Sequence, residues 1–177
     1  KGVGRCKIMV VKLPGIPMDE TKKARFMAEV KALRAYYYFD LVRMFKNIPL
    51  ILTPLTKEEI PLVMQAAPAD VYAQIEKDLN EAIPNLPMTL PANELGRLTK
   101  GAATALLGKV YLYDNKKTEA AAQLALVNGT PGGTSSFGYK LMEDFAELWD
   151  KKHEFNSESI LEISYSDKSN ADWGNFE

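Results

Sequence analysis

The sequence predicts a mainly α-helical fold, in which helix pairs stack into an α-α superhelix with long loops and minor β structure. Two observations predict it. Several segments place apolar residues three and four positions apart, and stretches rich in proline or glycine separate these segments. Only one short segment near the carboxyl end shows the apolar and polar alternation of a strand.

The first two helices are placed by their start and stop signals. Residues 2–13 are predicted to be the end of the first helix, which Pro14 and Gly15 stop. Asp19 is suited to cap the second helix, over residues 20–46, because its side chain can accept a hydrogen bond from the first turn. This long segment contains neither glycine nor proline, which favours one uninterrupted helix.

Three more helices follow a proline-rich connection over residues 47–67. A third helix covers residues 68–83, since proline is favourable at a first helical position and a second proline follows at the end. Thr99 is suited to cap a fourth helix over residues 100–114, and a fifth covers residues 118–127. A short turn at Asn115 and Lys116 joins these last two helices.

The character of the chain changes after residue 129. Residues 1–129 are predicted to form a helix-pair scaffold, and residues 130–177 a loop, a short helix over 142–149 and a strand over 159–165. Because a lone strand is not stable, its partners are expected in a further carboxyl-terminal region. We therefore interpret the chain as an internal part of a longer protein.

The fourth and fifth helices carry part of the tetratricopeptide repeat pattern. Leu107, Gly108 and Tyr111 match its first half, and Ala120 and Leu124 fall at the offsets of its second half. Small residues allow two antiparallel helices to approach closely, while the larger ones fill the seam between them. The match is partial, because the tryptophan and phenylalanine of the pattern are replaced, but it favours a helix-pair solenoid.

The composition argues against several kinds of chemistry. The 22 basic and 23 acidic residues nearly balance, so no basic surface for nucleic acid is expected. The only histidine, His153, and the only cysteine, Cys6, cannot build a histidine and cysteine metal cluster. We interpret them as a solvated loop residue and a buried thiol. No catalytic motif is present, so we predict no catalytic residues, metal or cofactor. A pair of carboxylates that act as general acid and base stays open as an alternative, but nothing in the sequence singles one out.

Arg34 stands inside the apolar stripe of the second helix. This stripe consists of Phe26, Val30, Leu33, Tyr37 and Leu41. A buried arginine requires a carboxylate or several carbonyl groups as partners. We therefore favour an internal ion pair from Arg34 to the next helix over a role in ligand binding.

Four successive aromatic residues, Tyr36, Tyr37, Tyr38 and Phe39, lie in the same helix. On a helical wheel Tyr37 joins the apolar stripe, Tyr38 lies on its flank, and Phe39 falls on a second face rich in alanine. Only Tyr36 lies on a charged strip. We interpret the run as core and not as a platform for a ligand.

Trp173 and Asn175 lie in the terminal stretch "SNADWGNFE". An aromatic face against sugar C–H groups, with amide and acid side chains for hydroxyl groups, is the makeup of a carbohydrate-binding surface. The two residues are therefore candidate ligand contacts. The alternative is that Trp173 packs against other chain segments.

A longer stretch carries a family resemblance. Residues 28–51, "AEVKALRAYYYFDLVRMFKNIPLI", resemble the pattern A-E-x-x-x-L-R-A-x-x-Y-F-x-L-V-R-x-F-G-x-x-P-L of the SusD/RagB family, the surface nutrient-binding lipoproteins of Bacteroidota. Four further stretches resemble the family in the same order, at residues 69–87, 96–113, 139–149 and 156–166. Lys46 departs from the family, which usually has glycine there.

The resemblance implies a tetratricopeptide-like scaffold that covers a SusC-type TonB-dependent transporter of the outer membrane. Such proteins capture an oligosaccharide, or in some lineages a peptide, and are not enzymes. It also implies attachment to the cell surface by an amino-terminal lipid anchor that this segment does not contain. A plain protein-binding or peptide-binding repeat module is the alternative, and an enzyme is the least favoured reading.

Overall fold

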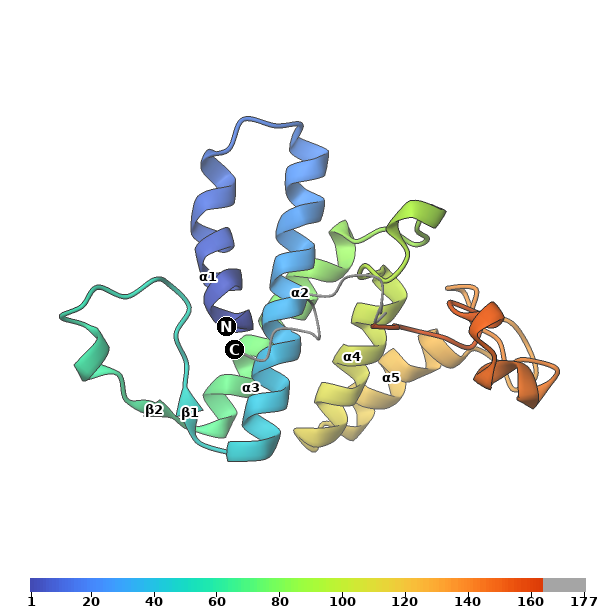
Figure 1. Cartoon of the computed structure of the whole chain (residues 1–177). Coiled ribbons are helices and arrows are strands. Elements are labelled where there is room, and N and C mark those ends of the chain that lie inside the picture. Colours follow the sequence, from blue (N-terminus) through green and yellow to red (C-terminus); the bar gives the residue numbers. More distant parts are fainter. Residues whose placement is uncertain (164–177) are drawn as a thin grey trace.

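The computed structural model describes residues 1–163, and these residues form a mainly helical fold (Figure 1), as the sequence predicts. The helices are α1 (Gly2–Lys12), α2 (Glu20–Phe45), α3 (Pro68–Ala82), α4 (Lys100–Tyr113) and α5 (Lys117–Asn128). Two short strands, β1 (Ile48–Pro49) and β2 (Gln65–Ala66), pair in antiparallel fashion. The five helices predicted within residues 1–129 are confirmed, with small shifts at their ends.

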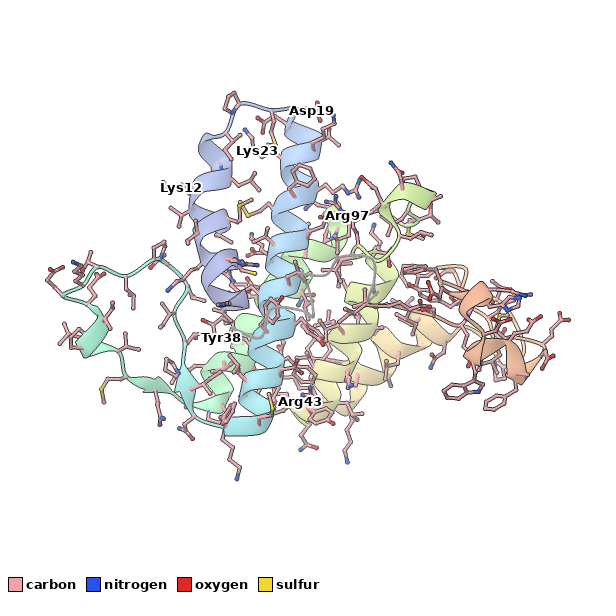
Figure 2. All side chains as sticks on the ribbon, in the orientation of Figure 1. Lys12, Asp19, Lys23, Tyr38, Arg43 and Arg97 are labelled. Carbon is pink, nitrogen blue, oxygen red and sulfur yellow. The ribbon has the colours of Figure 1, made fainter. Side chains whose placement is uncertain are left out.

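The two predicted caps are in place. The Asp19 carboxylate accepts a hydrogen bond from the backbone N–H of Lys22 at 2.9 Å. The Thr99 hydroxyl accepts one from the N–H of Ala102 at 3.1 Å. Each bond satisfies one of the N–H groups that a helix start leaves without a partner. In Figure 2, Asp19 and Arg43 mark the opposite ends of α2.

Helices that follow each other in the chain pack against each other. Figure 1 shows α1 and α2 side by side, and α5 beside α4. Gly108 of α4 faces α5 so closely that a Cβ atom there would lie 2.8 Å from two side-chain atoms of Leu124. Ala120 of α5 is also buried. The seam indicated by the partial repeat pattern is therefore the contact between α4 and α5.

The core lies where α2 is packed by α3 and α4. Tyr38 and Phe39 are each 1% exposed and are the largest buried side chains. The sequence places Tyr37 and Leu33 on an apolar stripe that was expected to be buried. This prediction was wrong, because the two residues are 36% and 39% exposed in the described part of the chain. The buried face of α2 is instead the alanine-rich one, since small side chains let neighbouring helices come close. Its members are Ala28, Ala32, Ala35, Phe39 and Val42.

The connection between α2 and α3 leaves the core as an arm, residues 50–64, which extends away from the helices in Figure 1. Its base is fixed by Tyr38, labelled in Figure 2. The Tyr38 hydroxyl donates to the carbonyl of Ile51 at 2.8 Å and accepts from its N–H at 2.9 Å. The antiparallel pair of β1 and β2 closes the arm at the same end.

Two predictions for the carboxyl-terminal part need correction. Residues 142–149 do not form an α-helix; only a 3-10 helix over Phe145–Trp149 is present. Its bonds run from the N–H of Glu147 and Asp150 to carbonyl groups three residues earlier, which is the 3-10 pattern. Residues 159–163 form no strand, because no other described segment pairs with them, and residues 164 and 165 lie outside the described residues. The division after residue 129 stays a prediction.

Candidate functional site

Arg34 lies in the scaffold and not in an open site. Its Nε and Nη2 atoms each donate to a carboxylate oxygen of Asp78 in α3 at 2.7 Å. Gln74 donates to the same carboxylate at 3.0 Å, and a third Arg34 nitrogen lies 3.4 Å from the Leu52 carbonyl oxygen. The Arg34 and Asp78 side chains are only 6% and 1% exposed. The arrangement joins α2, α3 and the base of the arm.

The predicted ligand contacts Trp173 and Asn175 lie outside the described residues, so their role stays a prediction. The described residues contain another candidate site, which sequence reasoning missed. A cleft of about 220 Å³ opens between the segment before α4 and two segments after α5. Its lining includes the aromatic side chains of Phe137, Tyr139 and Phe155 and polar side chains such as those of Arg97, Asn156 and Glu162.

One wall of the cleft is a tight turn over residues 135–139. The Ser135 hydroxyl accepts hydrogen bonds from the N–H groups of Phe137 at 3.3 Å and Tyr139 at 3.1 Å. The Ser135 N–H donates to the Tyr139 carbonyl at 2.8 Å. Gly138 has φ +85°, a conformation that glycine adopts without steric cost. The turn fixes the rings of Phe137 and Tyr139 with their centroids 6.3 Å apart.

Tyr139 packs against the start of α4. Its hydroxyl lies 3.3 Å from the Thr99 hydroxyl, which also caps that helix. A Cβ atom at Gly101 would lie 2.5 Å from the Tyr139 hydroxyl oxygen. Gly101 therefore provides the space in which Tyr139 sits.

The opposite wall is built from residues 155–162. The Phe155 N–H donates to the Glu162 carboxylate at 2.8 Å. The Asn156 side-chain oxygen accepts from the N–H groups of Glu158 and Ser159 at 2.9 and 3.2 Å. The Lys140 N–H donates to the Ser157 carbonyl at 3.0 Å, which ties this wall to the turn that carries Tyr139. Both walls are thus held by hydrogen bonds before any ligand arrives.

Arg97 connects the cleft to the helix scaffold, and Figure 2 shows it beside α2. Its guanidinium group pairs with the Glu29 carboxylate, which also accepts from Arg25 at 3.0 Å. Arg25 in turn pairs with Glu94 at 2.5 Å, and this hydrogen bond lowers the pKa of the Glu94 carboxyl group. The network fixes the position of Arg97 at the edge of the cleft.

A larger groove of about 700 Å³ lies next to the cleft, along α5 and the loop that follows it. Leu124 and Ala125 of α5 line it, together with Leu141 from the later segment. Tyr139 and Ile160 belong to the lining of both hollows. The cleft and the groove therefore adjoin at these two residues.

The chemistry of the cleft suits an uncharged, hydroxyl-rich ligand. Aromatic faces can cover C–H groups, while amide, carboxylate and guanidinium groups can bond hydroxyl groups. Within residues 1–163 no group of three His, Cys, Asp or Glu residues could hold a metal ion. No helix in that range is long and apolar enough to cross a membrane. The stretch "SSFGY", with aromatic residues around a glycine turn, is the sequence signal that could have located the cleft.

The fold and the candidate site together describe a class of protein: a scaffold of stacked helix pairs whose loops form a cleft with an aromatic and polar lining. Residues 13–112 match the family model of SusD-like proteins described as "Starch-binding associating with outer membrane". The match spans more than half of the chain, and the chain belongs to the SusD-like family. The resemblance seen in the sequence is confirmed.

Relatives agree with this assignment. The solved structure of a laminarin binding SusD-like protein is 54% identical with a TM-score of 0.91, covering 97% of this chain and 37% of that one. A SusD-like protein structure from Bacteroides fragilis is 28% identical with a TM-score of 0.84, covering 94% and 32%. A SusD-like protein of Bacteroides ovatus is 29% identical over 163 residues, covering 84% and 28%. This chain therefore spans only about a third of the length of these relatives.

Proposed function

We propose that this chain is part of a surface glycan-binding protein that captures oligosaccharides or polysaccharides for uptake. The single observation that carries the proposal is the 54% identity, over 97% of the chain, to a protein described as laminarin binding. Laminarin is therefore the first ligand to test. The aromatic and polar lining of the cleft at Phe137, Tyr139 and Phe155 supports an uncharged carbohydrate.

Delivery and location belong to the same proposal. The matched family is described as associating with the outer membrane. We propose that the whole protein is held at the cell surface by an amino-terminal lipid anchor. There it would pass its ligand to a SusC-type TonB-dependent transporter. Copurification of that transporter with the full-length protein from solubilised outer membranes would test the partnership.

Binding is tested with the full-length protein and purified laminarin by isothermal titration calorimetry. We expect saturable binding, and no heat of binding for alginate, an anionic polysaccharide. Tyr139→Ala should weaken laminarin binding about tenfold, as loss of an aromatic anchor does in other interfaces. Met64→Ala is the matched control, because Met64 is 82% exposed on the arm. A protein that binds no glycan would contradict the proposal.

The same protein separates the other two readings. Peptide capture, the alternative from the sequence, predicts binding of mixed peptides and none of laminarin. An enzyme predicts shortening of laminarin during incubation. We expect intact laminarin after prolonged incubation, since the proposed role is capture without reaction, and released reducing ends would contradict it.

A further inference from the structure

A protruding loop, residues 142–154, stands beside the cleft, at the orange end of the ribbon in Figure 1. The Lys140 N–H donates to the Ser157 carbonyl and the Met142 N–H to the Glu158 carboxylate, each at 3.0 Å, so the two ends of the loop are held together. Compact surface loops with adjacent ends are frequently functional. Here the residues directly before and after the loop line the cleft and the groove.

This loop carries two large aromatic side chains that no other residue of the described range 1–163 covers. Phe145 is 71% exposed and Trp149 is 77% exposed. Their ring centroids lie 6.0 Å apart with an angle of 71° between the rings, so the edge of one ring meets the face of the other. Exposed aromatic rings in contact with each other are typical of binding surfaces.

Carboxylate caps order the backbone that carries the two rings. The Asp144 carboxylate accepts from the Ala146 N–H at 2.8 Å and starts the 3-10 helix that contains both rings. The Asp150 carboxylate accepts from the Lys152 N–H at 3.1 Å and starts the next turn. His153 lies 3.6 Å from the Glu147 carboxylate and 3.7 Å from that of Asp150. Such prior order lowers the entropy cost of binding.

The net negative charge of the segment around the two rings restricts which class of glycan can bind. Residues 140–158 contain six acidic side chains and three lysines. A polyanion such as a uronate or sulfated glycan would be repelled, whereas carboxylates accept hydrogen bonds from the hydroxyl groups of a neutral sugar. The occupant that fits the rings, the charge and the adjoining cleft is an uncharged glycan chain.

We propose that Phe145 and Trp149 form a second glycan contact, which binds a neutral glucan chain as it leaves the Tyr139 cleft. The proposal rests on the proposed function. A pyranose ring stacks its C–H face on Trp149, and the edge contact with Phe145 keeps the indole in position. The exposed rings thereby extend the surface available to a polysaccharide beyond the cleft.

The test uses the full-length protein, laminarin and calorimetry. Trp149→Ala and Phe145→Ala should each weaken binding, with a loss of about tenfold for the tryptophan. Trp149→Phe should restore most of the affinity, because it keeps an aromatic face. Met64→Ala serves as the control, since Met64 is also an exposed apolar side chain, 82% exposed. It lies on the arm, which is distant in the sequence from the loop. All variants should keep the wild-type melting temperature.

The outcomes separate this proposal from the proposed function. If the wild-type protein binds laminarin and Trp149→Ala binds it equally well, the loop contact is refuted while glycan capture stands. If Trp149→Ala retains laminarin but no longer copurifies the transporter, the rings contact protein and the loop proposal is also refuted. A wild-type protein that binds no glycan refutes the proposed function itself.

Discussion

Arg34 of α2 and Asp78 of α3 form a two-bond ion pair, with both hydrogen bonds at 2.7 Å and both side chains buried. Two charges removed from water are tolerated because each satisfies the other, with Gln74 as an additional donor at 3.0 Å. The pair joins two helices and leaves neither charge free. The stability of the protein should therefore be sensitive to the loss of either partner.

Asp78→Ala should destabilise the protein by about 3–5 kcal/mol, because it leaves the Arg34 charge buried without a carboxylate. Chemical denaturation of the full-length protein measures this loss. Replacing both residues by apolar ones, Arg34→Met with Asp78→Leu, should recover most of the stability. A double variant as unstable as Asp78→Ala would show that the pair does more than neutralise its own charges.

Gly108→Ala should lower stability by about 1–3 kcal/mol, because the new Cβ would meet Leu124 at 2.8 Å. Gly4→Ala is the control, since nothing lies within 4 Å of that position in α1. It should raise stability by about 0.5–1 kcal/mol through better helix propensity. Leu124→Ala should relieve part of the loss at Gly108, measured as a double-mutant cycle. Equal effects at both glycines would argue against the close seam.

The sequence predicts this scaffold well because local signals decide it. Prolines, the caps at Asp19 and Thr99, and apolar spacing place all five helices. The buried face of α2 was harder to predict, because a helix that packs on several sides has two apolar faces. Which of the two faces is buried depends on helices that are distant in the sequence. Tyr37 was therefore predicted to be buried, although it is 36% exposed.

The candidate cleft could not be read from the sequence in the same way. It joins Arg97, Tyr139 and Phe155, which come from three loops. Their meeting depends on hydrogen bonds such as Lys140 to Ser157 that no periodic pattern encodes. Loop sites are positioned by the scaffold beneath them, so composition alone pointed to the terminal Trp173, outside the described residues.

Lys46→Gly should stabilise the protein by about 1 kcal/mol. Lys46 ends α2 with φ 60° and ψ −91°, a conformation that is strained for a residue with a side chain. The SusD/RagB pattern has glycine at this position. The positive φ is the physical reason, because glycine adopts it without steric cost. Asn115→Gly, at another positive φ of 60°, should change little, because asparagine tolerates positive φ. Thermal melts that rank the two variants in the opposite order would refute the argument.

Cys6 should react slowly with alkylating reagents at pH 8. Burial raises the pKa of its thiol, and the nearby positive charge of Arg34 opposes the shift only in part. The folded state therefore favours the protonated thiol. This contribution to stability is complete below the pKa of the unfolded thiol and is lost as the pH rises through the higher pKa of the folded state.

Measured by urea unfolding, the stability of wild type relative to Cys6→Ala should thus fall between pH 8 and pH 10. The comparison within a pair cancels the titration of other groups. A difference that stays constant over this range, or rapid alkylation of the native protein at pH 8, would contradict a buried neutral thiol.

Gly101→Ala should weaken laminarin binding by roughly fivefold, although Gly101 faces Tyr139 and not the ligand. The new Cβ would lie 2.5 Å from the Tyr139 hydroxyl oxygen and 2.7 Å from a ring carbon, so the ring must move out of its place. A displaced Tyr139 alters the wall shared by the cleft and the groove. Tyr139→Phe is the matched control, because it keeps the ring and loses only the hydroxyl group near Thr99.

If the effect runs through the ring, Gly101→Ala should add nothing to Tyr139→Ala in the double variant, because the displaced side chain is already gone. Calorimetry with laminarin on the four proteins measures this coupling. Additive losses would mean that the substitution at Gly101 acts by disturbing α4. Full affinity in Gly101→Ala would remove Tyr139 from the binding surface, since a ring that can move without consequence does not contact the glycan.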